Sequence, residues 1–242
     1  MSSDALFIVM LKDPTPGRVK TRLVGRELDA ERASAVAEAL ARCVVKRLLL
    51  RGGVALAVES EAVVHRLGLA STPGIIVTRQ GAGDLGSRIE RVWREIRPTG
   101  PAAFLGIDSP DVPAAALEAI PAALSCSQAA VGPTFDGGYW TLAANHVQPA
   151  LLEHIDWGGP TVYDQTVRRA LAAGISLTSL PTWHDVDQPA DLEALIERLT
   201  MLRIACSAGL PDQDARILEE LRLRLIWIVH SGREGAALRI ES

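Results

Sequence analysis

The sequence is poor in cysteine and contains no long hydrophobic run. Its 242 residues include only Cys43, Cys126 and Cys206, an odd number at wide spacing. Such a set argues against both a disulfide framework and a zinc site, and it predicts a reducing, cytoplasmic location. No apolar run reaches the roughly 18 residues of a membrane span, and the apolar start at residues 5–11 lacks the basic residues that precede a signal-peptide core. The sequence therefore predicts no membrane span.

An overall excess of basic residues is also missing. The formal net charge is −4, with 48% hydrophobic and 22% charged residues, so nothing attracts the chain as a whole to nucleic acid or anionic lipid. Internal repeats and low-complexity linkers are absent as well. The length predicts one large α/β domain over residues 1–200, followed by a C-terminal helical extension over residues 201–242 that would suit a homodimer contact.

Apolar runs of strand length alternate with amphipathic helical patterns. A buried strand is expected at residues 5–10, and a long helix follows with Asp29 as its N-cap and Gly52 and Gly53 at its end. Later strands are expected at residues 54–58, 75–77, 102–107, 129–131, 139–143 and 175–180, and helices near residues 61, 84–96, 113–124, 161, 189–202 and 212–230. This order predicts a mostly parallel sheet with helices on both faces, which becomes mixed at the Asp-Gly turn of residues 135–138.

The segment LKDPTPGRVKTRL, residues 11–23, is a local concentration of positive charge after the first strand. Its basic residues are Lys12, Arg18, Lys20 and Arg22. Ligands of parallel sheets bind beyond the carboxyl ends of the strands, which is where this loop lies. Gly17 would let phosphate approach the backbone, while Lys20 offers a point charge and Arg22 a bidentate fork. A nucleotide phosphate is the favoured ligand, and a solvated basic loop without a ligand is the alternative.

Carboxylates gather in two further motifs. Asp108 ends a strand in GIDSPD, and Asp185 and Asp187 stand two apart in HDVDQPADL, where an extended chain points both the same way. Without paired histidine or cysteine, these three acids suit Mg²⁺ or Mn²⁺. The alternatives are helix caps: Asp108 for a helix near Pro110, and Asp187 for the helix that begins at Pro189.

The stretch TFDGGYW, residues 134–140, is either a plain hairpin turn or an acceptor site. In the second interpretation Gly137 and Gly138 admit a substrate, Asp136 binds a hydroxyl, and Tyr139 or Trp140 forms a wall. Two look-alike motifs are set aside. GAGDLG, residues 81–86, matches a dinucleotide fingerprint but follows the third predicted strand, and GRVKT lacks the adjacent Gly, Lys and Thr of a P-loop.

Six stretches in order, KDPTPGRVKTRL, QGAGDLGSR, GIDSPD, GPTFDGGYW, IDWGGPTV and WHDVDQPADL, resemble the bacterial glycosyltransferase-like DUF2064 group. This group belongs to the nucleotide-diphospho-sugar transferase superfamily and is similar to the 2-phospholactate guanylyltransferases. The resemblance covers about residues 5–200 and implies a GT-A fold, a Rossmann-like three-layer α/β sandwich with a mostly parallel mixed sheet.

The resemblance also assigns roles to residues, which we state as expectations. Nucleotide binding falls to Lys12, Gly17, Arg18, Lys20, Arg22, Gln80, Asp84 and Arg88. Acceptor binding falls to Asp136, Gly137, Gly138, Tyr139 and Trp157. The expected catalytic residues are Lys20, Arg22, Asp108 and Asp136, and the expected metal ligands are Asp108, Asp185 and Asp187.

These motifs together predict a metal-dependent transferase that uses a nucleotide-activated donor and a small-molecule acceptor, with glycosyl transfer from an NDP-sugar as the leading hypothesis. One alternative is a nucleotidylyltransferase that joins an NTP to a small phosphorylated acceptor and releases pyrophosphate. The other is a catalytically silent nucleotide-binding module. Motifs for flavin, haem or S-adenosylmethionine are absent, and no nucleic acid partner is indicated.

Overall fold

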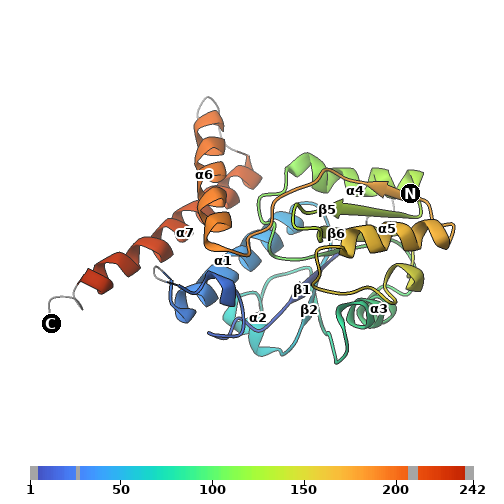
Figure 1. The fold of residues 1–242 in the computed structure, drawn as a ribbon, viewed down its shortest axis with the longest axis horizontal. Helices are drawn as coiled ribbons and strands as arrows, with labels where there is room; N and C mark the ends of the chain where they lie inside the picture. The colour runs from blue at the N-terminus through green and yellow to red at the C-terminus, as the bar shows by residue number, and fades with distance from the viewer. Residues whose placement is uncertain (1–4, 26–27, 207–211, 238–242) are drawn as a thin grey trace.

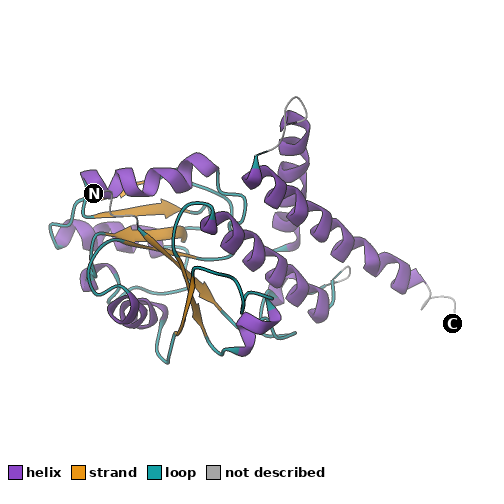
Figure 2. Ribbon diagram, turned by 180° about the vertical axis from the view of Figure 1, so that it is seen from behind, coloured by secondary structure: helices purple, strands orange, loops and turns teal. Residues whose placement is uncertain are grey.

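A seven-stranded mixed sheet forms the centre of the computed structural model, which describes residues 5–25, 28–206 and 212–237. Helices cover both faces of this sheet (Figures 1 and 2). The strands are β1 (Leu6–Leu11), β2 (Val54–Val58), β3 (Ile75–Arg79), β4 (Ala102–Leu105), β5 (Ala129–Pro133), β6 (Tyr139–Ala144) and β7 (Leu177–Ser179). The helices are α1 (Ala30–Leu49), α2 (Ala62–Arg66), α3 (Leu85–Ile96), α4 (Ala114–Cys126), α5 (Val162–Ala172), α6 (Pro189–Cys206) and α7 (Gln213–Ala237), with the short 3-10 turns η1 (Thr21–Leu23) and η2 (Pro149–Leu151).

The strand order is β3-β2-β1-β4-β6-β5-β7, and β6 is antiparallel to both of its neighbours while the other pairs are parallel. The predicted three-layer α/β fold with a mostly parallel mixed sheet is therefore confirmed. The reversal occurs at the turn of residues 134–138, as the Asp-Gly signal indicates.

Alternate side chains of β1 point to opposite faces of the sheet, and each face has its own core. Phe7 and Val9 pack beneath α1, α2 and α4, while Leu6 and Ile8 pack beneath α3 and α5. Strands buried on both faces explain why the sequence shows continuous apolar runs rather than alternation. Asp29 caps α1 as expected, since its Oδ1 accepts a hydrogen bond from the backbone N–H of Arg32 at 2.9 Å.

The last two helices pack on the outer face of α1 in a third hydrophobic cluster. Leu40 of α1 meets Leu195 of α6 and Leu225 of α7 there, and all three are fully buried. In Figure 1 α7 runs from this cluster away from the sheet, toward the C-terminus. The expected boundary at residue 200 lies inside α6, and a separate C-terminal unit stays a prediction. Among the described residues, no helix combines the length and the apolar character needed to cross a membrane.

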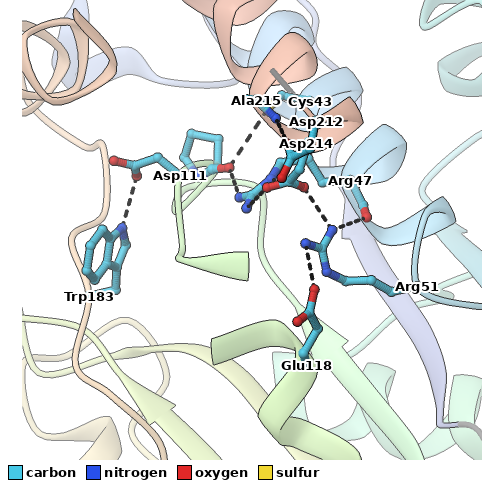
Figure 3. A network of polar contacts seen from close by, with 10 residues as sticks. Cys43, Arg47, Arg51, Asp111, Glu118, Trp183, Asp212, Asp214 and Ala215 are labelled. Carbon is cyan, nitrogen blue, oxygen red and sulfur yellow. Dashed lines mark hydrogen bonds and ion pairs between the residues drawn. The ribbon is translucent and has the colours of Figure 1, made fainter. Parts of the chain in front are cut away.

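A buried ion-pair network fastens α7 to α1 (Figure 3). The Arg47 guanidinium donates to both carboxylate oxygens of Asp214 at 2.9 and 2.8 Å, and Arg51 donates to the same carboxylate at 2.8 Å. Burial would raise the pKa of Asp214, but the hydrogen bonds and charges of the two arginines outweigh it and lower that pKa. Arg47 also donates to the Pro110 carbonyl at 2.6 Å, so the network holds the loop that carries Asp108.

Candidate functional site

Two adjoining cavities lie beyond the carboxyl ends of β1 and β4. The larger, about 390 Å³, is lined by the basic loop, and the smaller, about 140 Å³, is lined by the turn after β5 and by the acidic segment before α6. Gly106, Asp108 and Asp187 line both cavities. This is the edge at which ligands of parallel α/β sheets bind.

Four basic residues of the first loop line the larger cavity, but they face it differently. Lys12 is exposed, and the side chains of Arg18 and Arg22 are 63% and 71% exposed. Gly17 has φ +80° with open space around the position of a Cβ, so the loop needs glycine there for its backbone conformation. The loop therefore offers exposed cations at the rim of the cavity.

Lys20 points inward instead. Its side chain is 6% exposed, and its Nζ lies 2.6 Å from Asp108 Oδ1 and 3.1 Å from Asp187 Oδ1 and donates to the Val186 carbonyl. Lys20 adopts the left-handed region (φ 49°, ψ 35°), which is costly for a residue with a Cβ. Burial would lower the pKa of Lys20, but the carboxylates of Asp108 and Asp187 outweigh it and raise that pKa. The ammonium thus joins two acids at the boundary between the cavities.

Glu59 is a site residue that sequence reasoning missed. It follows β2, and its carboxylate lies 3.6 Å from Arg18 and 3.9 Å from Arg88 and accepts the backbone N–H of Asp13 at 3.1 Å. An acid directly after a buried strand is the same signal that singled out Asp108. Glu59 therefore holds Arg88, which lies outside the lining of the cavity, beside Arg18, which is part of that lining.

The predicted residues of the QGAGDLGSR stretch lie farther from the cavities. Gln80 is buried, and its Nε2 donates to the carbonyls of Leu11 and Ala57, which fixes the ends of β1 and β2. Asp84 caps α3 by accepting the Ser87 N–H at 2.8 Å. A Cβ on Gly86 would lie 2.2 Å from the Leu152 carbonyl. Gln80, Asp84 and Gly86 thus serve packing and helix capping.

Asp185 and Asp187 do lie together, but their third partner is Asp136. Carboxylate oxygens of these three residues all lie within 4.8 Å of one another. The expected third ligand, Asp108, also lines the smaller cavity, where its carboxylate, like that of Asp187, is paired with Lys20, and its role as a metal ligand stays a prediction. Sequence reasoning assigned Asp136 to catalysis and to an acceptor hydroxyl, because the two glycines that follow it would admit a substrate.

Asp185 has a strongly perturbed acidity. Burial, followed by the charge of Asp136, raises its pKa to about 6, and the charges of Asp187 and Asp191 act in the same direction. A cation bound between the carboxylates would offset the part of this shift that comes from their charges. The three acids offer oxygen ligands only, without histidine or cysteine, and so fit the hard ions Mg²⁺ and Mn²⁺.

Among the described residues, no backbone N–H at a helix start donates to the carboxylate of Asp108 or Asp187. The N-cap of α4 is Pro113, and the carboxylate of Asp187 binds Lys20 and Arg22. Asp191 supports the start of α6 instead, since its Oδ2 accepts the backbone N–H groups of Asp187 and Gln188 at 3.1 and 2.7 Å. This leaves the side chains of Asp108 and Asp187 to the site.

The turn after β5 is both a hairpin and a wall of the smaller cavity. Asp136 Oδ1 accepts from the Thr134 hydroxyl at 2.5 Å and from the Gly138 N–H at 2.9 Å, which fixes the carboxylate. Gly137 has φ +91°, and a Cβ there would lie 1.8 Å from the Pro160 carbonyl. Only glycine therefore lets this turn pack against the loop before α5.

The two expected aromatic residues of the acceptor site differ in their placement. Tyr139 lines the smaller cavity, and burial raises its pKa, whereas Trp157 lies behind it with ring centroids 6.2 Å apart. Within the described part of the chain, the Tyr139 hydroxyl and the Trp157 indole N–H have no hydrogen-bond partner. Trp140 forms another part of the wall and donates to the Pro181 carbonyl at 3.0 Å.

Asp111, the second acid of GIDSPD, holds the two acidic motifs together. It is 3% exposed and accepts the Trp183 indole N–H at 3.1 Å, as Figure 3 shows, and the Arg198 guanidinium at 2.7 Å. Trp183 precedes the acidic segment, and Arg198 lies on α6. Asp111 is therefore a positioning residue that sequence reasoning did not identify.

Solved structures share this fold. A proposed nucleotide-diphospho-sugar transferase from Desulfovibrio desulfuricans G20 is 22% identical with a TM-score of 0.71, covering 93% of this chain and 98% of that one. A share of 93% exceeds what residues 1–200 would supply, so the likeness includes part of the C-terminal helices. CMP:2-keto-3-deoxy-manno-octonic acid synthetase, complexed with CTP, is 13% identical with a TM-score of 0.52, covering 82% of this chain and 99% of that one. For 4-diphosphocytidyl-2C-methyl-D-erythritol synthase the identity is 10%, the TM-score 0.54 and the shares 83% and 99%.

No curated protein matches the chain. One family model does: DUF2064, described as "Uncharacterized protein conserved in bacteria", matches residues 36–159, which is just over half of the sequence. The matched range contains the GAGDLG, GIDSPD and TFDGGYW stretches. The resemblance inferred from the sequence is thereby confirmed, and the chain belongs to the DUF2064 family.

Proposed function

We propose that this protein is a metal-dependent transferase that takes a glycosyl group from an NDP-sugar. The observation that carries the proposal is that a group of basic side chains and a group of carboxylates lie next to each other. A rim of exposed arginines and an oxygen-only acid cluster adjoin at Lys20 and Asp187. A nucleoside diphosphate bound to a divalent cation has the charges that this pair of sites would complement.

The donor would occupy the larger cavity, which at about 390 Å³ falls within the range of small-molecule sites. Arg18 and Arg22 are exposed at its rim and would bind the diphosphate by charge-assisted hydrogen bonds. Lys20 would approach the same phosphates from the inner end, where it already bridges Asp108 and Asp187. Arg88, held beside Arg18 by Glu59, lies outside the lining and would add positive charge behind the rim.

Asp136, Asp185 and Asp187 would hold Mg²⁺ or Mn²⁺. When bound, the ion supplies positive charge that stabilises the departing diphosphate. Asp108 would stay with Lys20 and keep the ammonium beside the phosphates. The chain itself would thus contribute positioning and a preorganised field, which is how most of the barrier to such a transfer is lowered.

The acceptor would bind in the smaller cavity against Tyr139 and Gly138. In the transfer, an acceptor hydroxyl oxygen would form a bond to the anomeric carbon while the bond from that carbon to the diphosphate oxygen breaks. The electron pair leaves with the nucleoside diphosphate, and the hydroxyl proton goes to a carboxylate, for which Asp136 is our candidate.

A nucleotidylyltransferase is the second candidate, and the position of Lys20 favours it. An ammonium at the junction of the cavities would lie where negative charge develops on an α-phosphate under attack from an acceptor. That reaction would release pyrophosphate, which distinguishes it from glycosyl transfer. A silent nucleotide-binding module would release neither product.

The experiment is thermal unfolding of the purified protein with NTPs, NDPs and NDP-sugars, each with Mg²⁺, Mn²⁺ or EDTA, followed by product analysis. We expect a metal-dependent shift with NDP-sugars that is reduced in Asp185→Asn. Glu153→Gln is the matched control, because it removes an exposed carboxylate that lines neither cavity. A shift led by an NTP, with pyrophosphate release, would replace the glycosyl proposal by the nucleotidyl one. Absence of any shift would refute both.

A further inference from the structure

An exposed apolar patch lies on α7, on the side opposite to the face that packs on α1. Leu223 is 56% exposed and Trp227 is 59% exposed, although Leu225 between them is fully buried. The Arg224 guanidinium lies 4.7 Å from the centre of the Trp227 ring and covers one face of it. A leucine and a tryptophan left in water on one helix face are unfavourable, so the patch calls for a partner that covers it.

The exposed side chains of α7 have the spacing of a coiled-coil seam. Over residues 213–231, where the structure describes the side chains of this helix, every exposed residue except Arg224 recurs at intervals of three and four. We call these residues the outer stripe. They are Gln213, Arg216, Glu220, Leu223, Trp227 and His230. The helix therefore packs on the protein with one face and presents a second, regularly spaced face to solvent.

The outer stripe is preformed. The buried pair of Asp214 with Arg47 fixes the start of α7, and Leu225 and Ile228 hold the helix in the cluster that it shares with α1 and α6. In Figure 1 α7 extends from there away from the sheet. Because the helix is already ordered, little conformational freedom would be lost when a partner binds to it.

The outer stripe is complementary to itself when two copies lie antiparallel. A register that sets Leu223 opposite Trp227 of the second copy also sets Trp227 opposite Leu223 of that copy, by two-fold symmetry. The same register places Glu220 opposite His230 of the second copy, where a ring N–H can donate to the carboxylate. Glu220 binds Lys46 at 2.8 Å but its side chain is 65% exposed, so it can accept a further hydrogen bond.

Other arrangements fit the outer stripe less well. A parallel pair would set Glu220 against Glu220 and His230 against His230. An antiparallel pair shifted by one heptad would set Leu223 on Glu220 and Trp227 on Arg216, which loses the apolar contact. A membrane surface favours basic residues around the apolar ones, whereas Glu219 and Glu220 lie beside this patch.

We propose that α7 forms a two-fold symmetric, antiparallel contact with α7 of a second copy of this chain. Leu223 and Trp227 form its centre, and Glu220 of each copy faces His230 of the other. The homodimer contact expected from the sequence thereby has a definite surface and register. The apolar centre is small, so the dimer is reversible, with a dissociation constant of about 1–100 µM. The contact does not depend on the proposed transferase activity.

Sedimentation equilibrium of the full-length protein measures this dimer. We expect Trp227→Ala to raise the dissociation constant about thirtyfold or more, and Leu223→Ala to raise it about tenfold. Leu171→Ala is the matched control, because it removes an 81% exposed leucine from α5, and it should leave the constant unchanged. All three side chains are exposed, so circular dichroism should show that each variant keeps its helix content.

Substitutions of His230 test the antiparallel direction. His230→Arg should tighten the dimer and His230→Glu should weaken it, with constants about tenfold apart, and this difference should vanish in Glu220→Gln. Equal weakening by both substitutions would indicate a parallel pair and overturn the proposal.

Two further outcomes would overturn the proposal as a whole. One is a wild-type protein that stays monomeric up to about 300 µM, or a dimer that Trp227→Ala leaves intact. The other is a monomer that binds vesicles of phosphatidylglycerol and phosphatidylcholine through Trp227, which would assign the outer stripe to a lipid surface.

Discussion

Lys20→Met tests whether the buried ammonium joins the acids of the two cavities. Methionine keeps an unbranched apolar stem but removes the bonds to Asp108, Asp187 and the Val186 carbonyl. Hydrogen bonds to charged groups contribute about 1.5–3 kcal/mol each when their partners are desolvated. Here the carboxylates of Asp108 and Asp187 are 44% and 38% exposed, so water can replace much of what they lose. The expected loss in EDTA is about 2 kcal/mol in total.

For a chain of this size, a loss of 1 kcal/mol lowers Tm by about 2–4 °C, so Lys20→Met should unfold about 4–8 °C below the wild type in EDTA. Saturating Mn²⁺ should narrow that gap, because the ion no longer competes with an ammonium for Asp187. A tenfold gain in Mn²⁺ affinity would return about 1.4 kcal/mol. Arg22→Met is the matched control, since Arg22 is 71% exposed and lies 3.5 Å from the same carboxylate. Equal Tm values for Lys20→Met and wild type in EDTA, or equal Mn²⁺ shifts, would refute the reasoning.

Three further predictions concern acidity, packing and the helical extension. Because the pKa of Asp185 is raised to about 6 from 3.8, the folded state binds a proton that the unfolded state has lost between these pH values, so the contribution of Asp185 to the free energy of unfolding falls as pH rises from about 4 to 6. The difference in free energy of unfolding between the wild type and Asp185→Asn, measured in EDTA by denaturant melts, should therefore fall over this range, and a constant difference would contradict the shift. Gly137→Ala should lower the free energy of unfolding by about 2–4 kcal/mol, and Gly158→Ala by only about 1 kcal/mol. Both glycines have φ near +90°, but only at Gly137 would the added Cβ clash with the Pro160 carbonyl. Equal losses for the two variants in urea melts would contradict the clash. Arg47→Met should lower the free energy of unfolding by about 3–5 kcal/mol, because it breaks a buried ion pair with Asp214. Lys46→Met should lower it by less than about 1 kcal/mol, because its partner Glu220 is exposed. Equal losses for the two variants in chemical unfolding would contradict this.

The sheet and its helices were predictable because their signals are local. Continuous apolar runs identified the strands, and the acid before the first helical pattern identified the cap Asp29, whereas Asp84, expected to bind nucleotide, proved to cap α3. The place of the site was predictable too, since topology brings the carboxyl ends of β1 and β4 together. The sequence could thus locate the edge of the sheet at which the basic and acidic motifs meet.

The pairing of side chains within that edge was not predictable. Asp108 and Asp136 are both acids at strand ends, and sequence alone assigned the first to the metal and the second to the acceptor. In the structure Lys20, whose backbone is left-handed, places its ammonium against Asp108 and Asp187, while the roles of these acids stay predictions. Asp136 is meanwhile brought beside Asp185 by the contact between the β5 turn and the segment at Trp183. Both facts depend on contacts between residues far apart in the sequence, which no local pattern encodes.

That arrangement has a consequence for how the site would change on binding a ligand. With Lys20 drawn into the acids, the exposed cations of the larger cavity are Lys12, Arg18 and Arg22, and the Lys20 ammonium is the nearest of these positive charges to Asp187. A metal ion bound by Asp136, Asp185 and Asp187 would weaken the hold of Asp187 on Lys20, since the ion takes the same carboxylate. Lys20 would then be attracted to whatever phosphate the ion brings with it. Metal and nucleotide should therefore bind cooperatively, and Lys20→Met should abolish that cooperativity while leaving each ligand able to bind alone.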